Sequence, residues 1–433
     1  MRYEPIPTEL FISNRKKLAQ KLLPQSLAVL NSNDIYPKSA DGTMRFVQHT
    51  DIFYLTGIEQ EETVLLLFPD HPEAHMREIL VIRKTNPTIA QWEGEKLTAE
   101  KASQISGVQH VIFEDAFEKT LRELAFSAKR IYLNTNEHIR NTNQVPTRDD
   151  RFIQYCKQNF PLHQYERLAP LLHQIRVVKE KIEIELIKKN IQITKEALLR
   201  AASILKPSLK EYELEAEIIY TYIKHGASGH AFDPIIASGR NACILHYIEN
   251  NQVCQNGDLV LIDTGCCYAH YNADLTRVFP VSGTFTERQK QVYNAVLKTQ
   301  RFAMSLLRPN VLITEYQKEV EKFIQYQLVE LGLIPKHEIQ PTQIHPKVKH
   351  YFMHGVSHFL GLDVHDYGFR CEPLQANTVL TCEPGIYIAE EGLGIRLEND
   401  VIITEGGCMD LSADVPIEIE EIEDIMKKNK GLF

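Results

Sequence analysis

The sequence lacks long apolar runs and paired cysteines. No apolar stretch approaches the roughly 18 residues that a membrane-spanning helix requires. The polar segment 1–11 has no apolar core of the kind found in secretory signals. We therefore expect a cytoplasmic protein without a membrane partner. The eight cysteines are scattered and form no CxxC pair, which argues against a disulfide scaffold and predicts reduced thiols.

Excess positive charge is also absent. The formal net charge is −9, whereas a surface that binds phosphates needs clustered lysine and arginine. We therefore expect no nucleic-acid partner. Hydrophobic residues make up 43% and charged residues 24% of the chain, which is typical of a folded rather than a disordered protein.

The length of 433 residues is too great for one ordinary core and predicts two domains. Short apolar segments alternate with helical patterns in the first part, which favours an α/β layer domain. We expect this N-terminal domain over 1–172 and a second domain over 173–433. The expected strands are 27–30, 64–68, 79–82 and 130–133, and the expected helices are 14–23, 116–125, 176–202 and 212–226.

Two aspartates of the second domain lie next to apolar strands. Asp263 closes the apolar run 259–262, and Asp274 follows eleven residues later, before a second apolar stretch. Two strands joined by a short turn would bring both carboxylates together, and burying two like charges is costly unless a cation compensates. The alternative is that each aspartate caps a turn, and this pair alone leaves the choice open.

Three histidines and two glutamates add to this pair. His354, His358 and His365 fall within twelve residues among glycines and apolar residues, and histidine is a common neutral nitrogen ligand. Glu383 and Glu398 lie in apolar, strand-like stretches, where a carboxylate needs a metal or an arginine as its partner. Four carboxylates and one imidazole suit Mn²⁺, Fe²⁺, Co²⁺ or Zn²⁺, and they fit two ions that share bridging carboxylates.

These residues carry a resemblance to a known family. The set resembles the five-ligand signature of the pita-bread metallopeptidases, which include methionine aminopeptidase, prolidase, aminopeptidase P and creatinase. The chain resembles the aminopeptidase P group most, through the strings 241–247 (NACILHY), 354–366 (HGVSHFLGLDVHD) and 383–387 (EPGIY). A weaker resemblance continues into the N-terminal part at 39–41 and 50–57.

The resemblance implies a role for each matching ligand. Asp263 would bind one ion, and His358 and Glu383 would bind the other. Asp274 and Glu398 would bridge both ions. Glu383 would also be the general base toward the bridging water.

The resemblance also implies residues that act beside the ligands. The histidines expected to hold the substrate and move protons are His246, His354 and His365. Tyr387 and Arg396 would steady the ligands. The segment 368–373 is shorter than the matching loop of most relatives, and Arg370 is the arginine there that would stand near the pocket.

The fold that the resemblance implies is a pseudo-symmetric α+β pita-bread (creatinase/aminopeptidase-like) catalytic domain, preceded by a smaller α/β domain. In the family this smaller domain helps to form dimers or tetramers and can lend residues to a neighbour's pocket. We therefore expect a homodimer or homotetramer. Asp41 and Trp92 are candidates for that contribution, and for Trp92 a packing role is an equal alternative.

The implied activity is metal-dependent hydrolysis of the N-terminal Xaa-Pro bond in peptides with proline in second position. Two divalent ions, with Mn²⁺ expected first, would activate a hydroxide for this reaction. Prolidase, which cuts only Xaa-Pro dipeptides, uses the same ligands and is the alternative. A non-catalytic pita-bread binding module is a remote alternative, because such relatives typically lose ligands and all five are present here.

Overall fold

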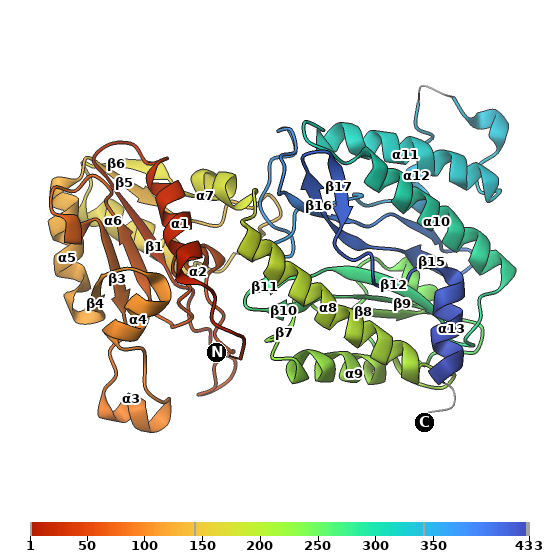
Figure 1. Ribbon diagram of the computed structural model, residues 1–433, viewed down its shortest axis with the longest axis horizontal. Helices are drawn as coiled ribbons and strands as arrows, with labels where there is room; N and C mark the ends of the chain where they lie inside the picture. Colours follow the sequence, from red (N-terminus) through yellow and green to blue (C-terminus); the bar gives the residue numbers. More distant parts are fainter. Residues whose placement is uncertain (1, 143, 341–342, 430–433) are drawn as a thin grey trace. The chain divides into compact units, whose positions relative to one another are not determined.

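The computed structural model describes residues 2–142, 144–340 and 343–429. Its contacts divide the chain into two compact units, one formed by Glu4–Arg176 and one that begins at Val177 (Figure 1). The predicted boundary between residues 172 and 173 stays a prediction, since contacts alone do not show where a separable domain begins. Within the described ranges, no helix combines the length and the apolar content needed to cross a bilayer.

A mixed six-stranded sheet forms the centre of the first unit. Strand β1 (Ser26–Asn31) pairs parallel with β5 (Arg130–Leu133) and antiparallel with β2 (Val64–Leu67). The sheet order is β4-β3-β2-β1-β5-β6, with β3 at Glu78–Ile82, β4 at His110–Phe113 and β6 at Gln164–Arg167. The four predicted strands fall on β1, β2, β3 and β5, so the α/β prediction for this unit is confirmed.

Helices pack beside this sheet. They are α1 (Thr8–Ala19), α2 (Thr50–Thr56), α3 (Pro87–Trp92), α4 (Ala99–Ser106), α5 (Glu114–Ser127), α6 (Arg148–Asn159) and α7 (Ala169–Arg176). One core joins apolar residues of the central strands, such as Leu27 and Leu66, to Leu121 and Leu124 of α5 and Cys156 of α6. Burial of this apolar surface is the main driving force for folding of the unit.

The first helix differs from its prediction. The sequence pattern predicts 14–23, whereas α1 spans Thr8–Ala19. Two polar residues occupy its buried face, because Asn14 donates to the carbonyl of Tyr54 at 2.9 Å and Arg15 pairs with Glu78 at 2.9 Å. A helix whose buried face includes polar side chains gives a weak apolar period.

The second unit repeats one arrangement twice, namely two long helices followed by an antiparallel three-stranded sheet. The first set comprises α8 (Lys181–Ile204), α9 (Glu211–Lys224), β8 (Ile235–Ser238), β9 (Leu259–Thr264) and β12 (Leu275–Pro280). The second set comprises α10 (Glu287–Leu306), α11 (Ile313–Glu330), β13 (Val379–Cys382), β16 (Asn399–Thr404) and β17 (Gly407–Asp410). This repetition agrees with the expected pseudo-symmetry.

Shorter elements complete the second unit. They are β7 (Gly229–His230), β10 (Cys266–Tyr268), β11 (Tyr271–Asn272), β14 (Gly385–Ile388), β15 (Leu393–Arg396), α12 (Val348–Tyr351) and α13 (Ile419–Asn429). Strands β14 and β15 form an antiparallel pair, and β10 pairs with both β7 and β11.

The long helix predicted at 176–202 corresponds to α8 but begins five residues later, at Lys181, because Arg176 is the last residue of α7. A capping box starts α8, in which the Glu183 carboxylate accepts the N–H of Glu180 at 2.8 Å. Further along α8, the Asn190 side chain accepts the N–H of Tyr268 at 2.7 Å and donates to its carbonyl at 3.1 Å. The helix thereby anchors the connection between β9 and β12.

Candidate metal centre

Strands β9 and β12 place two aspartates close together. Asp263 lies in β9, and Asp274 directly precedes β12. Gly265 permits this approach, because a Cβ at that position would overlap the carbonyl oxygen of Ala273. The backbone N–H of Asp274 donates to Oδ2 of the buried Asp400 at 3.1 Å, which fixes the start of β12.

His358 and Glu383 lie next to β13 of the second sheet. Glu383 directly follows β13, and its N–H donates to the carbonyl of Val356 at 2.8 Å. The backbone of His358 accepts the N–H of Thr381 at 2.9 Å, and its own N–H donates to Thr381 Oγ1 at 3.2 Å. Nδ1 of His358 lies 3.0 Å from the carbonyl of Phe359. Because Nδ1 donates there, the lone pair of Nε2 faces the carboxylates of Asp274 and Glu383.

Glu398 lies between β15 and β16 and is 2% exposed. Its Oε2 accepts a hydrogen bond from Thr276 Oγ1 at 2.6 Å, and its N–H donates to the Thr276 carbonyl at 3.2 Å. Thr276 belongs to β12. The same strand therefore orients both Asp274 and Glu398.

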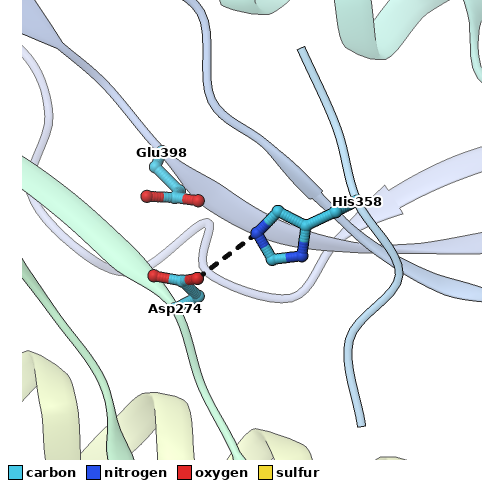
Figure 2. A group of neighbouring side chains, drawn as sticks. All are labelled: Asp274, His358 and Glu398. Carbon is cyan, nitrogen blue, oxygen red and sulfur yellow. Dashed lines mark ion pairs between the residues drawn. The ribbon is translucent and has the colours of Figure 1, made fainter. Parts of the chain in front are cut away.

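The predicted ligands meet in one place. Candidate ligand atoms of Asp274, His358 and Glu398 lie within 4.8 Å of one another (Figure 2). Nε2 of His358 is 3.4 Å from Asp274 Oδ2 and 3.5 Å from Glu383 Oε1. Asp263 is near enough to raise the pKa of both Asp274 and Glu398 by charge repulsion. The five residues are therefore clustered, and their role as ligands stays a prediction.

The electrostatics of the cluster favour a bound cation. Burial raises the pKa of Asp274 well above its usual range, and the neighbouring carboxylates add to this in the order Glu398, Asp263, Asp400 and Glu383. Burial also raises the pKa of Glu398, with Glu383 and Asp263 next in importance. Oδ1 of Asp263 and Oδ1 of Asp274 are buried without a hydrogen-bond partner. Divalent cations relieve both the repulsion and the unpaired oxygens, so these residues fit a metal centre.

Arg396 of β15 links the cluster to two further predicted residues. Its guanidinium donates from Nη2 to Asp263 Oδ2 at 2.6 Å and from Nη1 to Tyr387 Oη at 2.8 Å. Tyr387 Oη lies 2.8 Å from Nε2 of His354, whose Nδ1 donates to the carbonyl of Gly355 at 2.8 Å. Tyr387 is therefore the donor to His354. Burial, followed by the charge of Arg396, lowers the pKa of His354 to about 3.

The chain matches two family profiles. Residues 185–405 match metallopeptidase family M24, and residues 11–132 match the aminopeptidase P N-terminal domain. The Xaa-Pro aminopeptidase of Escherichia coli is 34% identical over 430 residues, which cover 96% of this chain and 97% of that protein. The chain belongs to metallopeptidase family M24.

Solved structures agree with the M24 assignment over both units. A Bacillus anthracis structure described as an aminopeptidase P is 36% identical, with a TM-score of 0.91 and coverage of 98% of this chain and 99% of that chain. A variant of Escherichia coli aminopeptidase P in complex with substrate is 32% identical, with a TM-score of 0.88 and coverage of 99% and 100%. The predicted α/β domain followed by an α+β pita-bread domain is confirmed.

Three other predicted residues surround the M24 site. The ring of His365 contacts that of His358 in an edge-on arrangement, with 4.3 Å between centroids. His246 lies exposed in a turn, and its electrostatic interaction with His354 is a minor cause of the lowered pKa of His354. The guanidinium of Arg370 lies 3.5 Å from where a Cβ of Gly355 would be. Their roles in binding and proton transfer stay predictions.

Glu211 at the start of α9 is a residue of the M24 domain that the sequence analysis missed. It is fully buried. Its two oxygens accept hydrogen bonds from Ser238, Asn241, Tyr247 and the N–H of Gln252. These donors flank His246, so Glu211 shapes the segment that carries that histidine. A glutamate in the first turn of a helix gave no signal, because such residues usually face solvent.

The two candidates in the N-terminal unit are both exposed. Trp92, in α3, is 80% exposed. The alternative of a packing role therefore fails within the single chain. Asp41 lies exposed in a loop. Their contribution to a neighbour's pocket stays a prediction.

Proposed function

We propose that this M24 protein is a Xaa-Pro aminopeptidase, which hydrolyses the N-terminal Xaa-Pro bond of peptides with proline in second position. The observation that carries the proposal is the convergence of four carboxylates and one imidazole in a single cluster. The Escherichia coli protein named Xaa-Pro aminopeptidase, which aligns with 96% of the chain, supports the substrate class.

The cluster would hold two divalent ions. Asp263 would bind one ion, His358 and Glu383 the other, and Asp274 and Glu398 would be shared. Oxygen donors with one imidazole favour Mn²⁺, with Zn²⁺, Co²⁺ or Fe²⁺ as alternatives. When bound, such ions polarise a carbonyl and lower the pKa of a water molecule.

The side chains of the site would control the protons. Glu383 would accept a proton from the attacking water and return it to the prolyl nitrogen as the peptide bond breaks. His354, whose Nδ1 lies 3.7 Å from Glu383 Oε2, has a pKa of about 3 and stays neutral near pH 7. As a neutral imidazole it would orient neighbouring groups, and its part in proton transfer stays a prediction. His246 and His365 would hold the substrate.

A matched pair of peptides tests the substrate class. We expect a Xaa-Pro-Yaa tripeptide to release its first residue and the corresponding Xaa-Pro dipeptide to be cleaved poorly. Prolidase is not favoured, because relatives that are 34% and 33% identical to this chain are named Xaa-Pro aminopeptidases. A clear preference for the dipeptide would nevertheless reverse this assignment. Metal uptake with hydrolysis of neither peptide would favour the non-catalytic alternative.

A substitution at Asp274 tests the site. We expect Asp274→Asn to lower kcat by about 100- to 1000-fold, because the variant loses a carboxylate that would hold both ions and so weakens the stabilisation that these ions would give to the developing negative charge. The exposed Asp414, which pairs with Lys195 at 2.7 Å, provides a matched control. Asp414→Asn should keep normal kcat. Near-normal turnover by Asp274→Asn in a peptide-release assay would contradict the proposed bridging role.

The protein would act as a homodimer or homotetramer. The support for this is the match of residues 11–132 to the aminopeptidase P N-terminal domain, together with the exposure of Trp92. The cytoplasmic location stays a prediction from the sequence.

A further inference from the structure

One loop of the second unit carries two of the site histidines at its ends. We call residues 358–366 the two-histidine loop. The N–H of Asp366 donates to the carbonyl of Phe359 at 2.9 Å, which closes the loop at its base. His358 and His365 lie beside these two residues, and their rings contact each other. The geometry of the base therefore sets how the two rings lie.

A buried ion pair anchors this base. Nζ of Lys179 lies 2.9 Å from Oδ2 of Asp366, and the two side chains are 2% and 1% exposed. Oδ1 of Asp366 accepts the N–H of Tyr367 at 2.8 Å. Gly361 faces the pair, because a Cβ there would overlap Asp366 Oδ2. Burying two charges is costly, and an apolar pair of similar volume is often as stable, so stability alone does not explain the ion pair.

Lys179 and the two-histidine loop are each hydrogen-bonded to a segment that precedes a proposed ligand. The N–H of Lys179 donates to the carbonyl of Asn377 at 2.9 Å, just before β13, the strand that Glu383 follows. Within the two-histidine loop, the carbonyl of Leu362 accepts a hydrogen bond from the Asn272 side chain at 2.9 Å. Asn272 ends β11, two residues before Asp274. The loop is thus tied to the segments that carry two of the proposed ligands.

We propose that Lys179 and Asp366 are positioning residues of the metal centre. Their ion pair holds the base of the two-histidine loop, so that His358 keeps its place beside Asp274 and Glu383 while His365 keeps its contact with His358. The kinetic part of this inference rests on the proposed function. Its metal-binding part can be measured without any peptide.

Two variants separate positioning from simple stabilisation. Lys179→Met removes the ammonium group that pairs with Asp366 and keeps most of the apolar stem. The double variant Lys179→Met/Asp366→Asn removes both charges of this ion pair. The amide oxygen of the new asparagine can still accept the N–H of Tyr367. Lys195→Met is the matched control, because it removes a lysine that pairs with Asp414 at the surface.

Three quantities are measured on the full chain. The first is the melting temperature, the second is the Kd for Mn²⁺ from calorimetric titration of metal-depleted protein, and the third is kcat on a Xaa-Pro-Yaa tripeptide, recorded together with its KM. We expect Lys179→Met to lower the melting temperature, and to weaken Mn²⁺ binding and kcat by about 10- to 100-fold with a smaller change in KM. The double variant should regain most of the melting temperature but neither Mn²⁺ affinity nor kcat. Lys195→Met should match the wild type.

Two results would overturn the inference. One is a double variant that regains Mn²⁺ affinity and kcat together with its melting temperature, because the pair would then serve stability alone. The other is wild-type Mn²⁺ affinity in Lys179→Met. Should Lys179→Met not fold, the double variant decides the matter by itself. A wild-type protein that binds Mn²⁺ but leaves the tripeptide intact would refute the proposed function, and the Mn²⁺ affinities would still test the positioning role.

Discussion

At the scale of single residues, the site holds more negative charge than its own cations balance. Burial opposes the charge of Arg396, yet Tyr387, Asp263 and Glu398 raise its pKa well above the usual value. This guanidinium pairs with only one oxygen of Asp263. The buried Arg277 also interacts with Glu398. Two guanidinium groups do not compensate four clustered carboxylates, and divalent ions would supply the remaining charge.

The melting temperature of the metal-free protein should depend on this excess of negative charge. Folding raises the pKa of Asp274 above 3.8, chiefly through burial. An acid of this kind binds more protons in the folded state, so it costs stability as pH rises above the unfolded pKa. We expect metal-free Asp274→Asn to melt above the metal-free wild type, by a margin that grows between about pH 4 and pH 7.

The difference between the two melting temperatures at each pH gives the contribution of the Asp274 carboxyl group to stability, because the other groups titrate in both proteins. With added Mn²⁺ the wild type should melt above Asp274→Asn, since only the wild type keeps the carboxylate that would bind the ion. A margin that is constant or shrinks with rising pH would contradict the electrostatic account.

At the scale of elements, the site depends on how closely β9 and β12 approach. Gly265 is the residue that allows this approach, since its missing Cβ leaves room for the Ala273 carbonyl. We expect Gly265→Ala to lower the free energy of unfolding by at least about 1–3 kcal/mol and to weaken Mn²⁺ binding. Urea unfolding and calorimetric titration measure the two effects.

Gly406 supplies the control for this substitution, because a Cβ there would have no neighbour within 4 Å. Gly406→Ala should change the free energy of unfolding by less than about 0.5 kcal/mol. If both substitutions changed the free energy of unfolding equally, the close approach of β9 and β12 at Gly265 would not be needed for stability.

The elements also show where sequence reasoning succeeds and where it stops. The ligand candidates were predicted because acidic residues in apolar strands are costly, and their spacing resembled a known family. The break between α7 and α8 was missed, since the helical period continues across residues 177–180. Glu211 and Asp366 were missed as organisers for another reason. Their partners come from segments distant in the sequence, and no local pattern records such contacts.

At the scale of the whole molecule, the exposed Trp92 offers a test of assembly. It is the single tryptophan of the chain, so intrinsic tryptophan fluorescence reports on α3 alone. If α3 contributes to a neighbour's pocket, the emission should shift to shorter wavelength as protein concentration rises and the oligomer forms. Light scattering gives the mass at each concentration. Assembly without a change in emission would exclude Trp92 from the interface.

We propose that five side chains of the second unit bind two divalent ions and that these ions make the chain a peptidase. This is tested by titrating metal-depleted protein with Mn²⁺ and recording the release of the first residue from a Xaa-Pro-Yaa tripeptide. We predict no release without metal and full activity near two equivalents of Mn²⁺ per chain. Release at full rate from the metal-free protein would contradict the claim.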